Sequence, residues 1–223
     1  MRLGVLSPAT GHVVPTDVVG RINPLCNVFG FTRGTPLGRY YLEQFLKVIR
    51  PHLRGRVLEI GGDAQSQKRM LLESDAITEY VTCDQLPYSK PTIVGDVNDP
   101  LLFDACSFDV VLAFNVLEHC RQPWNILKNF AQWLKPGGEA CVQVPNAQVV
   151  HRTSLDCFRI LPDGMRAMYE DAGFTDIVLH PFGNLHTSAS SLYGLATEDI
   201  ALDLLDVLDE RYPVITCCIC KRA

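Results

Sequence analysis

The sequence predicts an α/β fold, with a mostly parallel β-sheet covered by helices on both faces. Short apolar strands alternate with helical segments over most of the chain, which is the pattern of parallel sheets. The segment Phe108–Phe114 is apolar apart from Asp109, as expected of a strand buried on both faces. The chain has 223 residues, 47% of them apolar and 20% charged, and this is enough to bury one sizeable core.

The first 35 residues predict an irregular arm, because they are rich in glycine and proline and lack clean periodicity. From Pro36 the pattern becomes helical, since Leu37, Tyr41 and Phe45 recur at four-residue steps. This helix should end before Pro51, because the residue that precedes a proline is biased away from helical backbone.

The first half of the predicted core contains three short strands, each of which ends at a glycine or an aspartate. These residue types favour turns at strand ends. A helix should connect the first strand to the second. The elements are the strand Arg56–Ile60 before Gly61 and Gly62, the helix Gln65–Glu73, the strand Glu79–Cys83 before Asp84, and the strand Thr92–Val94 before Gly95 and Asp96.

The second half contains two helices whose ends are set by proline and glycine. Pro136, Gly137 and Gly138 should stop the first helix, Gly173 should cap the second, and Pro145 should halt the strand between them. The elements are the strand Phe108–Phe114, the helix Pro123–Leu134, the strand Glu139–Val144, the helix Pro162–Ala172, and the strands Phe174–His180 and Tyr212–Cys220.

Composition excludes several classes of function. The net charge is −5, so no broad basic surface is available for nucleic acid. The apolar runs are too short to span a bilayer, and the first residues have no apolar signal region, so we expect a cytoplasmic protein.

An odd number of cysteines, nine, argues against a disulfide framework. Cys217, Cys218 and Cys220 fall in the apolar run Val214–Cys220, which predicts a buried strand with reduced thiols.

Acidic side chains mark the ends of three successive predicted strands. Glu59 lies just before Gly61, where backbone without a Cβ lets a ligand approach closely. Asp84 ends the second strand, and a carboxylate there can bind both hydroxyls of a ribose. Asp96 ends the third strand, where it can accept a hydrogen bond from an adenine amino group. Because the strand ends of a parallel sheet meet at one edge, the three acids predict a nucleoside-containing ligand.

These segments resemble the class I S-adenosylmethionine-dependent methyltransferases. The resemblance covers most of the chain from Pro36 onward. It is closest to a group of bacterial small-molecule and sugar methyltransferases that often occur beside glycosyltransferases and natural-product enzymes. The segments that carry this narrower resemblance are RGTPLGRYYLEQFL, FGNLHTSASSLYGLATEDI and YPVITCCICKRA. The segments that carry the wider resemblance are VLEIGGD, TCDQ, IVGDVND, FDVVLAFNVLEH and LKPGG.

The resemblance implies a fold, a domain organisation and a cofactor. The fold is a three-layer α/β/α Rossmann-like sandwich around a seven-stranded sheet, with the last strand antiparallel. Residues 1–223 form a single methyltransferase domain, in which residues 1–50 are an arm and a lid helix and residues 51–223 are the catalytic core. The cofactor is S-adenosyl-L-methionine.

The family's cofactor-binding positions map onto named residues here. Glu59 and Gly61 would hold the methionine end of the cofactor, and Asn115 would lie beside its amino group or sulfonium. Asp63 and Gln65 occupy the second and third glycine positions of the family's G-x-G-x-G loop; an aspartate tolerates left-handed backbone, so the turn can still form. Arg39 and Tyr40, on the lid helix, would close over the cofactor, with Arg39 pairing with its carboxylate. Asp84 would bind the ribose, and Asp96 and Val97 would bind the adenine. The complete set of residues expected to bind the cofactor is Arg39, Tyr40, Glu59, Gly61, Gly62, Asp63, Asp84, Gln85, Asp96, Val97 and Asn115.

Three histidines are candidates for removing a proton from the methyl acceptor, since imidazole titrates near neutral pH. His119 follows the fourth predicted strand, His151 follows the fifth, and His186 lies in a C-terminal segment. Arg152, Asp156 and Arg159 could hold a polar or anionic acceptor. We find no recognisable set of metal ligands and expect no metal.

The sequence therefore predicts an S-adenosylmethionine-dependent O-methyltransferase that acts on a small-molecule hydroxyl, preferably of a sugar or glycosylated metabolite in a natural-product pathway. A homodimer is a possible assembly. Two alternatives stay open: an N-methyltransferase of a small-molecule amine, and a non-catalytic protein that binds S-adenosylmethionine. A nicotinamide-dependent dehydrogenase is disfavoured, because it would need G-x-G-x-x-G directly after the first strand.

Overall fold

The computed structural model describes residues 4–6, 13–15, 21–70, 72, 74–151 and 155–223. The chain divides into two compact units. The first unit contains Met1–Gln44, Pro145–Val150 and Pro181–Ile215, and the second contains Phe45–Val144, His151–His180 and Thr216–Ala223.

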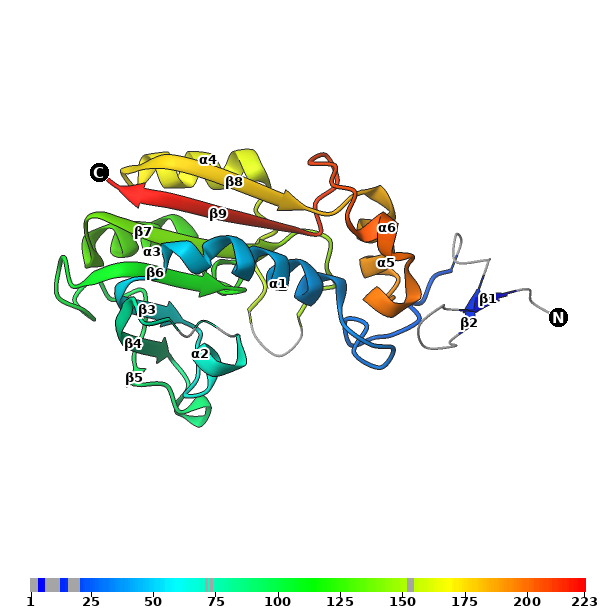
Figure 1. The fold of residues 1–223 in the computed structure, drawn as a ribbon, viewed down its shortest axis with the longest axis horizontal. Coiled ribbons are helices and arrows are strands. Elements are labelled where there is room, and N and C mark those ends of the chain that lie inside the picture. Colours follow the sequence, from blue (N-terminus) through cyan, green and yellow to red (C-terminus); the bar gives the residue numbers. More distant parts are fainter. Residues whose placement is uncertain (1–3, 7–12, 16–20, 71, 73, 152–154) are drawn as a thin grey trace. The chain divides into compact units, whose positions relative to one another are not determined.

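The second unit is built on a seven-stranded sheet (Figure 1). The pairs β5–β4, β4–β3, β3–β6 and β6–β7 are parallel, and β9 runs in the opposite direction in Figure 1. The prediction of a mostly parallel sheet with an antiparallel last strand is confirmed. In order across the sheet, the strands are β5 (Ile93–Val94), β4 (Ile77–Asp84), β3 (Gly55–Ile60), β6 (Phe108–Phe114), β7 (Leu134–Pro145), β9 (Ile215–Arg222) and β8 (Phe174–Phe182).

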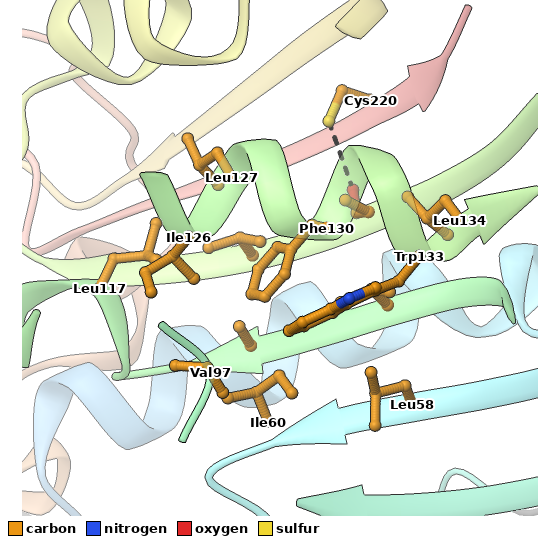
Figure 2. Packing of buried hydrophobic residues seen from close by; sticks show 14 of the residues in the cluster. Leu58, Ile60, Val97, Leu117, Ile126, Leu127, Phe130, Trp133, Leu134 and Cys220 are labelled. Carbon is orange, nitrogen blue, oxygen red and sulfur yellow. Dashed lines mark hydrogen bonds between the residues drawn. The ribbon is translucent and has the colours of Figure 1, made fainter. Parts of the chain in front are cut away.

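Helices α3 (Pro123–Trp133) and α4 (Pro162–Asp171) cover one face of this sheet. Ile126, Phe130 and Trp133 recur at three- and four-residue steps along α3 and are fully buried, so one apolar stripe packs on the strands. Figure 2 shows this stripe against Leu58 and Ile60 of β3.

On the other face of the sheet lies the end of α1 (Leu37–Ile49), residues 45–49, which belongs to the second unit. Phe45 is fully buried, and its ring lies edge-on to that of Phe114 at the end of β6. Successive side chains of a strand point to opposite faces. Ala113 packs on the face that α3 covers, so Phe114 points to the other face. Helices on both faces give the three-layer arrangement.

The largest differences between predicted and observed bounds are in three elements. The helix expected over Gln65–Glu73 is only α2 (Ser66–Arg69). Strand β7 begins at Leu134 rather than Glu139, because Pro136–Gly138 form an irregularity inside the strand, where its register against β6 shifts. Strand β9 begins at Ile215. The expected irregular arm contains two paired three-residue strands, β1 (Gly4–Leu6) and β2 (Val13–Pro15).

The first unit contains two helices that the sequence did not predict, α5 (Leu185–Leu192) and α6 (Leu202–Leu205). Asn184 caps α5 by accepting from the Thr187 amide, and its own amide donates to the Leu204 and Val207 carbonyls. No described helix is long and apolar enough to cross a membrane.

Each cysteine of the chain lies within the described residues, and all nine are free thiols. Cys217, Cys218 and Cys220 are fully buried in β9. Burial raises the pKa of Cys217 and Cys220, because a thiolate would lose its hydration. The predicted buried strand with reduced thiols is confirmed.

An ion pair at the start of β3 gives a test of stability. Glu139 is buried, and it hydrogen-bonds with Arg54 and His52. Replacing Arg54 by methionine should lower the free energy of unfolding by about 1–2 kcal/mol, because the carboxylate loses a charged partner that is itself partly hydrated. In Lys221→Met, which breaks the exposed pair with Asp176, the loss should stay below ~0.5 kcal/mol. Urea unfolding measures both.

The effect of Arg54→Met should depend on pH. Burial alone would raise the pKa of Glu139, but the hydrogen bonds and charges of Arg54 and His52 lower it below its usual range. A carboxyl whose pKa is lowered on folding stabilises the protein above its unfolded pKa and stops doing so as pH falls through the folded one. The difference between wild type and variant should therefore vanish in acid; an equal difference at pH 7 and in acid would contradict this assignment.

Candidate functional site

A cavity of about 770 Å³ opens at the carboxyl ends of β3, β4, β5 and β6, and all its lining residues belong to the second unit. This is within the ~300–1,000 Å³ range of small-molecule sites. Strand β3 lies between β4 and β6 in the sheet. After β3 the chain therefore forms β4 and β5 on one side of it, and then returns to form β6 on the other side. Ligands of open α/β sheets bind at such a switch point.

A turn of two glycines follows β3, and the first of them lines the cavity. Gly61 lines it with a φ of +76°, which an L side chain rarely adopts, and a Cβ here would lie 3.0 Å from Val116. A Cβ on Gly62 would lie 2.7 Å from the carboxylate of Glu59. The turn thus needs both glycines, and it leaves bare backbone facing the cavity.

Glu59 lies beneath this turn rather than among the lining residues. Its side chain is buried, and Oε2 accepts a hydrogen bond of 2.9 Å from the Tyr80 hydroxyl. Burial and the nearby Glu59 charge raise the pKa of Tyr80, so the phenol keeps the proton that it donates. Glu59 therefore lies against the glycine turn, and its predicted place at the methionine end of the cofactor stays a prediction.

Gly61 carries a test with a matched control. Gly61→Ala should destabilise the protein by about 1–2 kcal/mol, the cost of left-handed backbone for an L residue, and should weaken cofactor binding because the turn must shift. The matched control is Gly164→Ala in α4. Gly164 does not adopt left-handed backbone, and a Cβ there would lie at an ordinary 3.8 Å from Ile160. That change should stabilise by about 0.5–1 kcal/mol. Thermal unfolding and calorimetry with the cofactor measure both; equal effects would contradict the role of the turn.

Two aspartates give one wall of the cavity its negative charge. Asp84 lies at the end of β4, and its Oδ1 accepts from the amide of Leu86 at 2.9 Å. Asp96 accepts from Gln85 at 2.7 Å and from the backbone and side chain of Asn98. The Asn98 backbone bond is the largest cause of the lowered pKa of Asp96, so this carboxylate is ionised near neutral pH.

Asp63, at the second glycine position of the family loop, does not adopt left-handed backbone. Its Oδ1 accepts from the amide of Gln65 at 2.8 Å, and its own amide donates to Ser66 at the start of α2. The loop reaches α2 by this side-chain turn, so it needs no glycine there. Neither Gly62 nor Asp63 lines the cavity.

Asn115 lies at the end of β6, on the cavity wall, with a φ of 55°. The side-chain amide of Gln143 donates to its Oδ1 at 3.1 Å, and the backbone amide of Asn115 donates to the Gln143 carbonyl. Gln143 is buried. Asparagine is one of the few residue types that tolerate this backbone, and Gln143, which the sequence did not identify, fixes its orientation.

Two of the three predicted histidines lie together at one side of the cavity. The rings of His119 and His151 have centroids 4.9 Å apart, and His119 lines the cavity beside Leu155. Nδ1 of His119 hydrogen-bonds with the Leu155 carbonyl. Burial is the largest cause of the lowered pKa of His151, although the charge of Asp156 opposes it; the ring is therefore neutral near pH 7.

Asp156 and Arg159 bind each other. Both terminal guanidinium nitrogens of Arg159, Nη1 and Nη2, donate to Asp156, which also accepts from the His151 amide at 2.7 Å. The Arg159 hydrogen bonds lower the pKa of Asp156 to about 2. This pair braces the loop that carries His151. Arg152 lies outside the described residues.

Three predicted site residues belong to the first unit. Arg39 pairs with Glu43 one turn along α1, the Tyr40 hydroxyl donates to Asp206, and His186 is exposed on α5. Their proposed roles stay predictions.

The residues present fit a nucleoside cofactor with a cationic centre. The cavity offers two carboxylates and bare glycine backbone on one side, and an oriented amide on the other. Carboxylates accept from ribose hydroxyls and an adenine amino group, and they attract positive charge. The sequence missed several lining residues, among them Leu86, Asn98, Arg121 and Leu155, because nothing in their spacing marks them.

Comparisons with known proteins identify the family. A family model described as a methyltransferase domain matches residues 37–179. A search of curated proteins found no match.

Three solved structures share the fold. A SAM-dependent methyltransferase from Archaeoglobus fulgidus has 16% identity over 82% of this chain and 93% of that one, with a TM-score of 0.58. A protein from Thermotoga maritima described as a "possible histamine N-methyltransferase" has 16% identity over 84% and 92%, with a TM-score of 0.57. The [4+2]-cyclase SpnF has 14% identity over 85% and 83%, with a TM-score of 0.55.

The family model covers more than half of the chain and contains the glycine turn, both aspartates, Asn115 and both clustered histidines. The chain therefore belongs to the methyltransferase-domain family and is an S-adenosylmethionine-dependent methyltransferase.

Proposed function

We propose that this methyltransferase transfers the methyl group to a hydroxyl of a small molecule, giving an O-methyl ether. The supporting observation is the pair of imidazoles, His119 and His151, beside the cavity. An aliphatic hydroxyl must lose its proton during attack, whereas an amine with a free lone pair needs no strong base. Groups that help a proton to leave therefore favour an oxygen acceptor.

The residues of the cavity would divide the work between cofactor and acceptor. S-adenosylmethionine, when bound, supplies an activated methyl group on a sulfonium. Asp84 would accept hydrogen bonds from its ribose, Asp96 and the Val97 backbone would hold its adenine, and Gly61 would let the backbone approach its methionine end. Asn115 would orient the reacting end, since a methyl transfer depends on alignment.

On the first unit, we propose that Arg39 and Tyr40 close over the bound cofactor. Arg39 could then pair with the cofactor's carboxylate. His186 is the third candidate for the group that removes a proton from the acceptor. This role rests on its place in the segment FGNLHTSASSLYGLATEDI.

We propose a sugar or glycosylated metabolite of a biosynthetic pathway as the acceptor, on the strength of the segments that resemble bacterial sugar methyltransferases. Nine free thiols suit a reducing compartment, which supports a cytoplasmic location.

An N-methyltransferase is the second candidate. One similar structure is described as a "possible histamine N-methyltransferase", and an amine acceptor would leave the two histidines without a chemical task. In that case alanine at His119 and at His151 would each leave substantial turnover.

The experiment that separates these candidates uses methyl-labelled S-adenosylmethionine with matched panels of glycosides and amines. We expect label in methyl ethers, identified by mass spectrometry and NMR, together with release of the demethylated cofactor. Label found only on nitrogen would overturn the proposal in favour of the amine. A protein that binds the cofactor but never releases its demethylated form with either panel would be a non-catalytic binder.

A further inference from the structure

Glu118, His119 and His151 form a cluster beside the cavity. One ligand atom from each residue lies within 4.8 Å of those of the other two. Oε1 of Glu118 is 3.7 Å from Nε2 of His119, and the two imidazole rings stand 4.9 Å apart between centroids. The cluster combines the first two residues, on the turn Leu117–His119 after β6, with a third from the loop after β7.

The carboxylate of Glu118 is the unusual member of this cluster. The residue is 0% exposed, and neither carboxylate oxygen accepts a hydrogen bond from another described residue. Burying a carboxylate without such partners costs several kcal/mol, and such groups are normally paired with a cation or bind a metal. The guanidinium of Arg159, whose charge acts on Glu118, donates its hydrogen bonds to both oxygens of Asp156.

The backbone holds the cluster in place independently of any ligand. The amides of Cys157 and Phe158 both donate to the Glu118 carbonyl, at 2.7 and 3.3 Å. They tie the turn after β6 to the segment that follows His151. Asp156 accepts from the His151 amide in the same segment. The two loops that supply the cluster are thus joined directly beside it.

His119 has the hydrogen bond typical of a metal ligand. Its Nδ1 pairs with the Leu155 carbonyl, which can only accept, so Nδ1 carries the proton. In the neutral ring, Nε2 then has the lone pair, and Nε2 is the atom nearest Glu118. Metal-binding histidines almost always donate their second ring N–H to a carbonyl or carboxylate in this way.

We propose that Glu118, His119 and His151 bind a divalent cation at the acceptor side of the cavity. The inference rests on the proposed function only for what the cation does there, not for whether it binds. Two imidazoles and one carboxylate suit Zn²⁺, Fe²⁺, Co²⁺ or Mn²⁺ rather than Ca²⁺ or Mg²⁺. Three protein ligands leave a coordination position open, and His119 lines the cavity from which an acceptor would fill it.

The cluster needs only a small contraction to bind such an ion. Metal–ligand distances of about 2.0–2.2 Å place the ligand atoms of one ion about 3–3.5 Å apart. The described atoms lie within 4.8 Å, so side-chain rotations of about an ångström would suffice. The sequence alone predicts no metal here, because its ligands come from two loops and only the fold brings them together.

Such a cation would activate a hydroxyl acceptor. Its charge lowers the pKa of a hydroxyl that it binds, so the proton passes to water as attack begins. The new C–O bond forms while the donor's C–S bond breaks, and the sulfonium leaves as a neutral thioether. The charge and the atoms balance without an added oxidant or reductant.

The test measures metal binding directly. The full-length protein is freed of metal by chelation and dialysis, then titrated with Co²⁺ and followed by visible absorption and calorimetry. We expect one equivalent to bind, with d–d bands that indicate nitrogen and oxygen ligands. Glu118→Gln and His151→Ala should each weaken binding at least ~10-fold. His52→Ala, which removes an imidazole at Glu139, should leave binding unchanged.

Each outcome decides the proposal. Binding well below one equivalent, or the same affinity in wild type and both cluster variants, overturns the site, provided that circular dichroism shows the variants folded. Full hydroxyl methylation by the metal-free protein overturns the cation's role in activating the acceptor and leaves the proposed O-methylation standing. Stoichiometric Co²⁺ binding that the cluster variants lose, without methylation of any hydroxyl, upholds the metal site and contradicts the proposed function.

Discussion

Replacing His151 by alanine should lower turnover by at least ~100-fold and leave cofactor affinity nearly unchanged. The side chain lies beside His119, outside the part of the cavity formed by the two aspartates. Its imidazole would either accept the acceptor's proton or bind the cation that releases it, and a positioned group of this kind contributes about 10²–10⁴ in rate. Removal should therefore act on kcat rather than on binding of S-adenosylmethionine. Steady-state kinetics with a hydroxyl acceptor and calorimetry with the cofactor give the two numbers.

His52→Ala is the matched control for this prediction. His52 lies just before β3, at the amino ends of the strands and on the opposite edge of the sheet from the cavity. Its loss should change stability through Glu139 and leave kcat within about twofold of wild type. If His151→Ala keeps near-native turnover while His119→Ala or His186→Ala abolishes it, a different histidine carries the chemistry. If all three variants turn over normally, the amine acceptor becomes the better interpretation.

Strand positions were predictable because their signal is local. Phe108–Phe114 has the predicted bounds of β6, since a strand buried on both faces must be apolar along its whole length. Helix α5 has no comparable signal. Its sequence, LHTSASSL, lacks a strong apolar period, and contacts distant in sequence hold it, such as Asn184 with Leu204 and Ser191 with Ala147. Only the spacing of Asn184 and Thr187, a capping box, could have marked its start.

The cofactor side of the site was predictable for a topological reason. Asp84 and Asp96 each follow a strand, and parallel strands bring their carboxyl ends to one edge. The acceptor side depends on how two loops fold back. The sequence did not identify Glu118, and its burial without a hydrogen-bond partner among the described residues is visible only in three dimensions. Gln143 likewise alternates with apolar residues in β7 and has no sign of its contact with Asn115.

Asp84→Ala should weaken binding of S-adenosylmethionine by about 2–3 kcal/mol, which corresponds to ~30- to 150-fold in affinity. The aspartate lines the cavity at the end of β4, where its carboxylate can accept from both hydroxyls of a ribose. Hydrogen bonds to a charged group have this magnitude, and the hydroxyls would be left without partners. Calorimetry with the cofactor alone measures the effect, so no acceptor needs to be known.

Asp84 also accepts from the Leu86 amide, and its removal could disturb the turn as well as the ligand. Asp84→Asn separates the two effects, because an amide oxygen can still accept from Leu86 while the charge is lost. We expect Asn to bind the cofactor more weakly than wild type and more tightly than Ala, with wild-type stability. Asp104→Ala removes a carboxylate that precedes β6, at the other edge of the sheet, and should not change the affinity. Wild-type affinity in a folded Asp84→Ala variant would show that the ribose is held elsewhere, whereas equal weakening in Asp84→Ala and Asp104→Ala would show that only net charge matters.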